Sequence, residues 1–148
     1  QSEVLARLAS YNSVGVSFDW TSHVEYLALE KAGVKMQNVD ECFRNSMAVK
    51  NEWELAQIQK ACDIAEESFL ALLPEIKEGM TETEVAALLE YNMRKRGAQG
   101  LAFPTIVAFG AHAAVPHHET GETKLSFGDE ILIDFGCFQS AVQSPLLF

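Results

Sequence analysis

The side chains best suited to catalysis or metal binding lie within residues 103–136, in the last third of the chain. This stretch holds three of the four histidines, His112, His117 and His118, and an aspartate, Asp134, that closes an apolar run. Imidazole and carboxylate groups are common proton-transfer groups and metal ligands. A catalytic or metal-binding site is therefore expected in this stretch.

Asp134 follows the apolar residues Ile131, Leu132 and Ile133, a pattern that predicts a strand over 130–134. Its carboxylate would lie at the rim of a buried sheet, where an ionised group must be hydrogen-bonded, paired or bound to a metal. The alternative is a turn aspartate that accepts backbone N–H bonds around Phe135 and Gly136. The position of Asp134 alone leaves both interpretations open.

His117 and His118 are adjacent, and neighbouring residues of an extended segment point to opposite faces. One metal ion is therefore not expected to take both. We expect one of them to face a pocket and the other to face solvent. A structural or surface role is the alternative for either histidine.

Before this stretch, the N-terminal residues predict a strand, a helix and a second strand. The strands are expected over 14–18 and 34–39, and the helix begins after Ser22, with Glu25 as its capping-box partner. Such a βαβ-like unit is too small to be a domain alone, so it is interpreted as the tail of a preceding α/β domain. Residues 40–50 have no clear period and are expected to form a connection.

Two helices and several strands are predicted next. Asn51 with Glu54, and Thr81 with Glu84, are capping pairs that each begin an amphipathic helix. The strands are expected over 105–109, over 130–134, and as a return strand that begins at 113–115 and runs into 116–118. Helices followed by strands indicate an α+β fold.

Composition and charge exclude several classes of function. The formal net charge of −10 argues against nucleic acid or an anionic membrane as a partner, and no apolar run is long enough to span a bilayer. The three cysteines, Cys42, Cys62 and Cys137, are expected to be buried thiols in a reducing cytoplasm. Phosphate-binding glycine loops, paired cysteines at zinc spacing and the Gly-x-Ser-x-Gly motif of serine hydrolases do not occur in the sequence.

Several sequence blocks resemble the pita-bread metallopeptidases, the family of the Xaa-Pro aminopeptidases and the Xaa-Pro dipeptidases or prolidases. The blocks occur in the family's order and spacing: KNEWELAQIQKA (50–61), GMTETE (79–84), GAQG (97–100), FPTIV (103–107), Pro116-His117 and GDEILIDFG (128–136). The resemblance implies that residues 46–148 are the first half of a creatinase/aminopeptidase-like catalytic domain. Residues 1–45 would be the remnant of its N-terminal domain, so that the chain is expected to be incomplete at both ends.

The resemblance also implies a chemistry. Such enzymes hydrolyse Xaa-Pro bonds with two divalent ions, manganese, cobalt or zinc, held by two Asp, one His and two Glu. By position Asp134 matches the first metal-binding aspartate, and His117 matches the first of the histidines that position substrate and stabilise the transition state. His118 receives no role from the motif. Proline-containing peptides are the implied substrates, and homodimers are common in the family.

The resemblance stops after Gly136. Ser144 still fits the family pattern, but Pro145 occupies the place of the second metal-binding aspartate and offers neither a carboxylate nor a backbone N–H. The remaining His and Glu ligands have no match among the 148 residues. The chain is therefore expected to be an inactive fragment of a cytoplasmic metallopeptidase. The alternative is a non-catalytic pita-bread relative that binds peptides or proteins.

Overall fold

The computed structural model describes residues 2–139 and 142–147, with the side chains of residues 3–139. The chain forms two compact units, Gln1–Lys50 and Asn51–Phe148, so the observed division lies five residues after the predicted boundary at 45/46. The assignment of the first unit to the remnant of an N-terminal domain stays a prediction.

The first unit contains the expected βαβ arrangement. Strands β1 (Val14–Val16) and β2 (Met36–Asn38) are parallel, and helix α2 (His23–Lys31) connects them. The capping box of Ser22 and Glu25 is confirmed, because the Ser22 side chain accepts from the Glu25 N–H and the Glu25 side chain accepts from the Ser22 N–H.

Two further helices of this unit were not predicted: α1 (Ser2–Ala9) and α3 (Asp40–Ala48). The prediction that 40–50 is an irregular connection is therefore wrong. The predicted burial of Cys42 is also wrong, because it lies exposed on α3, whereas Cys62 is half-buried and Cys137 buried.

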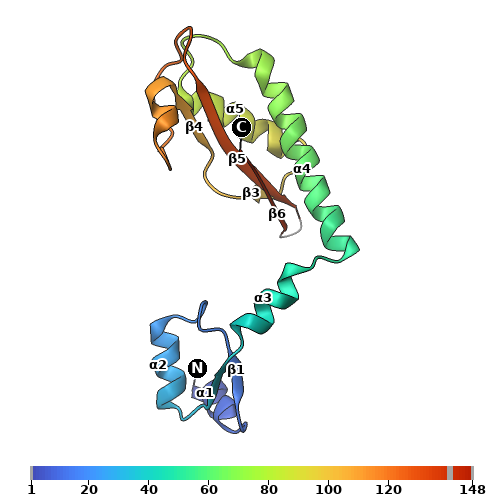
Figure 1. Ribbon diagram of the computed structural model, residues 1–148, viewed down its shortest axis with the longest axis vertical. Helices are drawn as coiled ribbons and strands as arrows, with labels where there is room; N and C mark the ends of the chain where they lie inside the picture. Colours follow the sequence, from blue (N-terminus) through green and yellow to red (C-terminus); the bar gives the residue numbers. More distant parts are fainter. Residues whose placement is uncertain (1, 140–141, 148) are drawn as a thin grey trace. The chain divides into compact units, whose positions relative to one another are not determined.

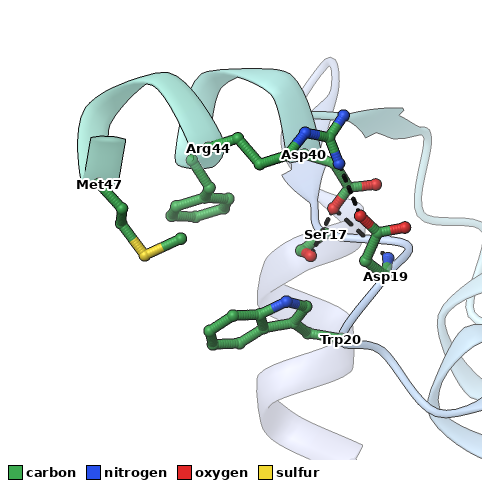
Figure 2. A pocket seen from close by; sticks show the side chains of 7 residues that line it. Ser17, Asp19, Trp20, Asp40, Arg44 and Met47 are labelled. Carbon is green, nitrogen blue, oxygen red and sulfur yellow. Dashed lines mark hydrogen bonds and ion pairs between the residues drawn. The ribbon is translucent and has the colours of Figure 1, made fainter. Parts of the chain in front are cut away.

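Asp40, the first residue of α3, connects that helix to the segment after β1. Its buried carboxylate accepts hydrogen bonds from the Ser17 hydroxyl at 2.5 Å and the Phe18 N–H at 3.1 Å. Figure 2 shows the side chains of Ser17 and Asp40, with Trp20 and the ion pair of Arg44 with Asp19. These residues line a cavity of about 260 Å³. The two hydrogen bonds to Asp40 join residues 22 and 23 positions apart, which a search for local periodicity cannot detect.

The first unit is expected to lose stability in acid. The Ser17 hydroxyl outweighs burial and, together with backbone N–H groups, holds the pKa of Asp40 below its ordinary 3.8. A carboxyl whose folded-state pKa is lowered contributes stability above its unfolded pKa and loses it as the pH falls through the folded value. The test uses a Trp53→Phe variant, so that Trp20 fluorescence reports the unfolding of the first unit. The urea concentration at the unfolding midpoint should decrease as the pH is lowered below about 5. Asp40→Asn should make the urea midpoint depend less on pH. If the midpoints with and without Asp40→Asn decreased in parallel in acid, the prediction would be contradicted.

The second unit begins with two helices that start where predicted. Helix α4 (Glu52–Leu72) has the Asn51 and Glu54 capping box, and α5 (Glu82–Lys95) has that of Thr81 and Glu84. The 3-10 helix η1 (Leu73–Glu75), which contains Pro74, follows α4. Gly97, with a φ of 100°, follows the C-cap of α5 in the left-handed conformation in which glycine commonly ends a helix.

A small antiparallel sheet lies beside these helices (Figure 1). Its long strand β5 (Ile131–Gln139) pairs with β3 (Gly100–Leu101), β4 (Ile106–Phe109) and β6 (Val142–Leu147). Helix α5 contacts β4, and α4 contacts β5. The described residues contain no helix whose length and apolar character would suit a membrane span. The unit has the α+β arrangement that the sequence predicts.

The core of the second unit lies between the two helices and one face of the sheet. Strand β5 contributes alternate residues to it, Ile133, Phe135 and Cys137. Helices α4 and α5 supply most of the other core residues: Ala61, Ile64, Ala65, Leu72, Val85, Ala86, Leu89 and Met93. Since side chains alternate along a strand, the position of Asp134 is fixed on the face away from the helices.

Candidate active site

Asp134 lies in the middle of β5, not at the end of a strand. The strand continues to Gln139, and Asp134 pairs with Ile106 of β4. The turn interpretation of Asp134 is therefore wrong. Its half-buried side chain lines a cavity of about 600 Å³.

His117 lines the same cavity, together with Phe103, Pro104 and Ile106. The same two residues, His117 and Asp134, also line a neighbouring cavity of about 310 Å³. The structure thus brings together the two residues that the sequence analysis selected. Their roles in binding and catalysis are not tested by this proximity.

The backbone around His117 is not the predicted return strand. Residues Gly110–Ala114 form the 3-10 helix η2, and His117 has a φ of 54°, the one positive φ of a non-glycine residue among the described residues. A left-handed conformation costs free energy for a residue with a Cβ, and it persists where surrounding contacts hold it. The expectation of two histidines on opposite faces of a strand therefore does not apply. His117 is exposed, and His118 is turned inward.

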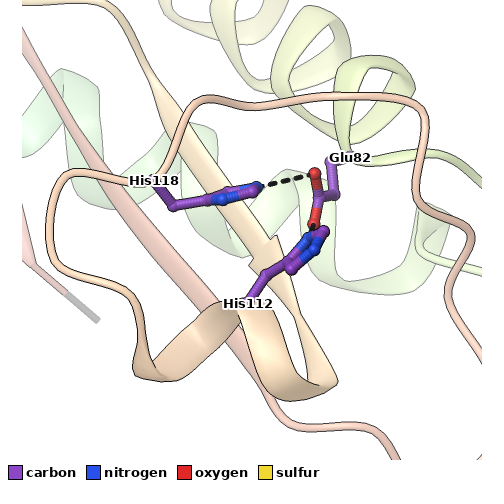
Figure 3. A group of neighbouring side chains, drawn as sticks. All are labelled: Glu82, His112 and His118. Carbon is purple, nitrogen blue, oxygen red and sulfur yellow. Dashed lines mark hydrogen bonds and ion pairs between the residues drawn. The ribbon is translucent and has the colours of Figure 1, made fainter.

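The contacts that hold this segment come from Glu82, which the sequence analysis did not select. Glu82 is the first residue of α5 and its side chain is fully buried. One carboxylate oxygen accepts from the Phe109 N–H at 3.1 Å and lies 2.9 Å from His112 Nδ1. The other accepts from the Gly121 N–H at 2.9 Å and lies 2.9 Å from His118 Nε2. Figure 3 shows both rings directed at the carboxylate.

This environment keeps Glu82 ionised. Burial by itself would raise the pKa of its carboxyl, but the hydrogen bonds from His118, from His112 and from the N–H groups of Gly121 and Phe109 lower the pKa to about 2. Hydrogen bonds that a buried carboxylate accepts stabilise its ionised form and offset the free-energy cost of burying the charge. Glu82 therefore carries a negative charge over the whole neutral range.

The group of Glu82, His112 and His118 has the composition of a metal site. One ligand atom of each residue lies within 4.8 Å of the others, and the two ring centroids are 4.3 Å apart. The sequence offered a weak signal for Glu82, because an acidic residue in the first turn of a helix is explained by the helix dipole alone. Its two histidine partners lie 30 and 36 positions away, beyond the reach of a local pattern.

Comparisons with known proteins find similar peptidases. The sequence model of metallopeptidase family M24 matches residues 56–144. An Xaa-Pro dipeptidase of Pyrococcus horikoshii is 38% identical over 118 residues, which make up 79% of this chain and 34% of that protein. The chain thus spans about a third of the length of the curated relatives that it matches.

Solved structures show the same similarity. An X-Pro aminopeptidase from Thermotoga maritima is 34% identical, with a TM-score of 0.91 over 99% of this chain and 41% of that protein. The prolidase from Pyrococcus horikoshii is 33% identical, with a TM-score of 0.91 over 98% of this chain and 42% of that protein. The fold is therefore the pita-bread peptidase fold, matched over about two fifths of each of these two proteins.

Proposed function

Because the chain belongs to metallopeptidase family M24, we propose that it is part of a metal-dependent exopeptidase that hydrolyses Xaa-Pro peptide bonds. The observation that carries the proposal is the shared cavity of His117 and Asp134, the two residues to which the sequence resemblance assigns roles in the family's site. The Xaa-Pro dipeptidases and prolidases among the relatives support the substrate class.

We assign different roles to the two residues. Asp134 projects from the face of β5 that does not enter the core, where its carboxylate can serve as a metal ligand. The exposed imidazole of His117 can donate an N–H to a substrate carbonyl in the same cavity, and so orient the substrate or stabilise negative charge on its oxygen. Both roles are proposals.

The residues of this chain do not complete the family's two-metal site. Asp134 is the one member of the five-ligand set that the sequence supplies, and the backbone register places position 145, a proline, opposite Gly136 on the adjacent strand. Ligand number and geometry determine metal affinity, so a single carboxylate does not hold a metal pair. We therefore propose no reaction step for the 148-residue polypeptide by itself.

The purified 148-residue chain is expected to show no metal-dependent hydrolysis of Xaa-Pro dipeptides. The release of free proline would be followed with manganese, cobalt or zinc added in turn, and a full-length Xaa-Pro dipeptidase would serve as the positive control. Turnover above the metal-only blank that disappears in Asp134→Asn would contradict the expectation, because it would show a working site within these residues.

The proposal of a peptidase is tested separately by reading the source DNA through and beyond the codons for residues 136–148 in all frames. An Asp, a His and two Glu codons at family spacing would support it. A long reading frame with a packed-domain pattern but without these ligands would instead favour the non-catalytic binding module. The comparisons do not favour that alternative, because the relatives with assigned names are dipeptidases and aminopeptidases.

Several finer expectations stay predictions. They are the identity of the metal, a homodimer, the cytoplasmic location and the absence of nucleic-acid and membrane partners. The metallopeptidase family itself supports divalent metal binding and a peptide substrate.

A further inference from the structure

We propose that Glu82, His112 and His118 form a separate binding site for one divalent transition-metal ion of the zinc class. The site does not include Asp134 and does not depend on the proposed peptidase function. Nothing in the family's ligand set of two Asp, one His and two Glu corresponds to a carboxylate and two histidines at these positions.

The ligand types are those that zinc prefers. Two imidazoles and one carboxylate hold zinc in a class of sites that leave the fourth position to a water molecule. Such ligands lie about 2.0–2.2 Å from the ion, which places the ligand atoms roughly 3.4 Å from one another. The observed ligand atoms lie within 4.8 Å, and each ring nitrogen is 2.9 Å from a carboxylate oxygen. Ring movements of about an ångström would bring the three groups to zinc distances.

The carboxylate is oriented by groups that would remain in place when a metal binds. The Phe109 N–H and the Gly121 N–H each donate to one oxygen of Glu82, from two different segments of the chain. Backbone donors of this kind fix the direction of a ligand and are an established feature of metal sites. The imidazole nitrogens can exchange their contact with the carboxylate for a contact with the ion, once each presents a lone pair.

The site is accessible to an ion from solution. The His112 side chain is 41% exposed, and the His118 side chain, 13% exposed, lines the cavity of about 600 Å³. An ion could therefore enter without opening the core, and a water molecule could occupy its fourth position. The competing explanation is a purely structural network in which both rings donate hydrogen bonds to Glu82, and metal titration distinguishes the two explanations.

The test uses the full 148-residue chain, freed of metal with a chelator, and Zn²⁺ alone as the probe in calorimetric titration. We expect one ion per chain in the wild type. His112→Ala is the main variant, since this half-exposed ring can be removed while His118 and both N–H groups still contact Glu82. Its dissociation constant should rise by at least about 100-fold, beyond the 10- to 100-fold effect of losing an outer-shell partner.

Three matched variants locate the ion. His23→Ala removes the exposed histidine of the first unit, and His117→Ala removes the neighbour of His118. Asp134→Asn removes the proposed family ligand, and all three should bind Zn²⁺ as the wild type does. Co²⁺ as a second probe should give visible absorption typical of four-coordinate nitrogen and oxygen ligands, without the near-ultraviolet band of a thiolate.

The proposal is overturned if the wild type does not bind Zn²⁺ at millimolar concentration, or if His112→Ala binds as tightly as the wild type. Loss of binding in Asp134→Asn would assign the ion to the family site instead. A thiolate band with Co²⁺ would assign it to a cysteine. Neither of the last two results would contradict the proposed peptidase, so the two proposals fail separately.

Discussion

Replacement of Glu82 by alanine is expected to destabilise the second unit by about 3 to 5 kcal/mol in the presence of a chelator, because it removes one partner of a buried charged network. The four groups directed at the carboxylate would lose their acceptor: two backbone N–H groups and two imidazoles. Each buried donor without a partner costs about 1 to 3 kcal/mol. Water that enters at the half-exposed His112 would reduce the total.

Amide hydrogen exchange of β4 and β5 in low concentrations of urea measures this change in the second unit alone. Glu66→Ala is the matched control, since Glu66 is exposed within α4 and its loss should change stability by no more than about 0.5 kcal/mol. Glu82→Gln keeps the size and one acceptor oxygen, so it should cost less than Glu82→Ala. Equal protection factors for Glu82→Ala and Glu66→Ala would show that the buried carboxylate does not hold the segment that carries His117.

Phe135→Ala should destabilise the second unit by a similar amount, about 3 to 5 kcal/mol, because it leaves a cavity in a packed core. Phe135 is fully buried on the core face of β5 and stacks on Phe69 of α4, with ring centroids 5.9 Å apart. The residue before it in the strand is Asp134. The packing of Phe135 therefore also determines how firmly the proposed metal ligand is held.

The control for this variant is Phe127→Ala, the same change at a side chain that is 96% exposed. It should alter stability by about 0.5 kcal/mol or less. Hydrogen exchange of the β5 amides again gives the free energy of unfolding. If Phe135→Ala and Phe127→Ala were equally stable, the result would contradict the packing of Phe135 in the core beside Asp134.

Local sequence signals predicted much of this protein. Each capping box begins a helix where expected, because the hydrogen bonds of a cap join residues three positions apart. The apolar run before Asp134 predicted β5, although the strand proved longer. The family resemblance, based on ordered blocks, is confirmed by the match to residues 56–144.

Features that depend on distant contacts could not be predicted in this way. Helix α3 begins at Asp40, whose carboxylate binds groups of residues 17 to 19, and the segment of His117 is shaped by Glu82 from another element. Glu82 received no role from the sequence, because an acidic residue in the first turn of a helix is explained by the helix dipole alone. Its burial and its two histidine partners become visible only when the chain is folded.

The sequence by itself determined the starts of α2, α4 and α5, the α+β order, the family and the choice of His117 and Asp134. These follow from hydrogen bonds, periodicity and motifs that act over a few residues. Only the tertiary structure decided which face of β5 carries Asp134, that His117 shares its cavity, and that Glu82 joins His112 and His118. Those relations depend on contacts between separate elements, such as those of Glu82 with histidines 30 and 36 positions away, and a local sequence pattern does not contain them.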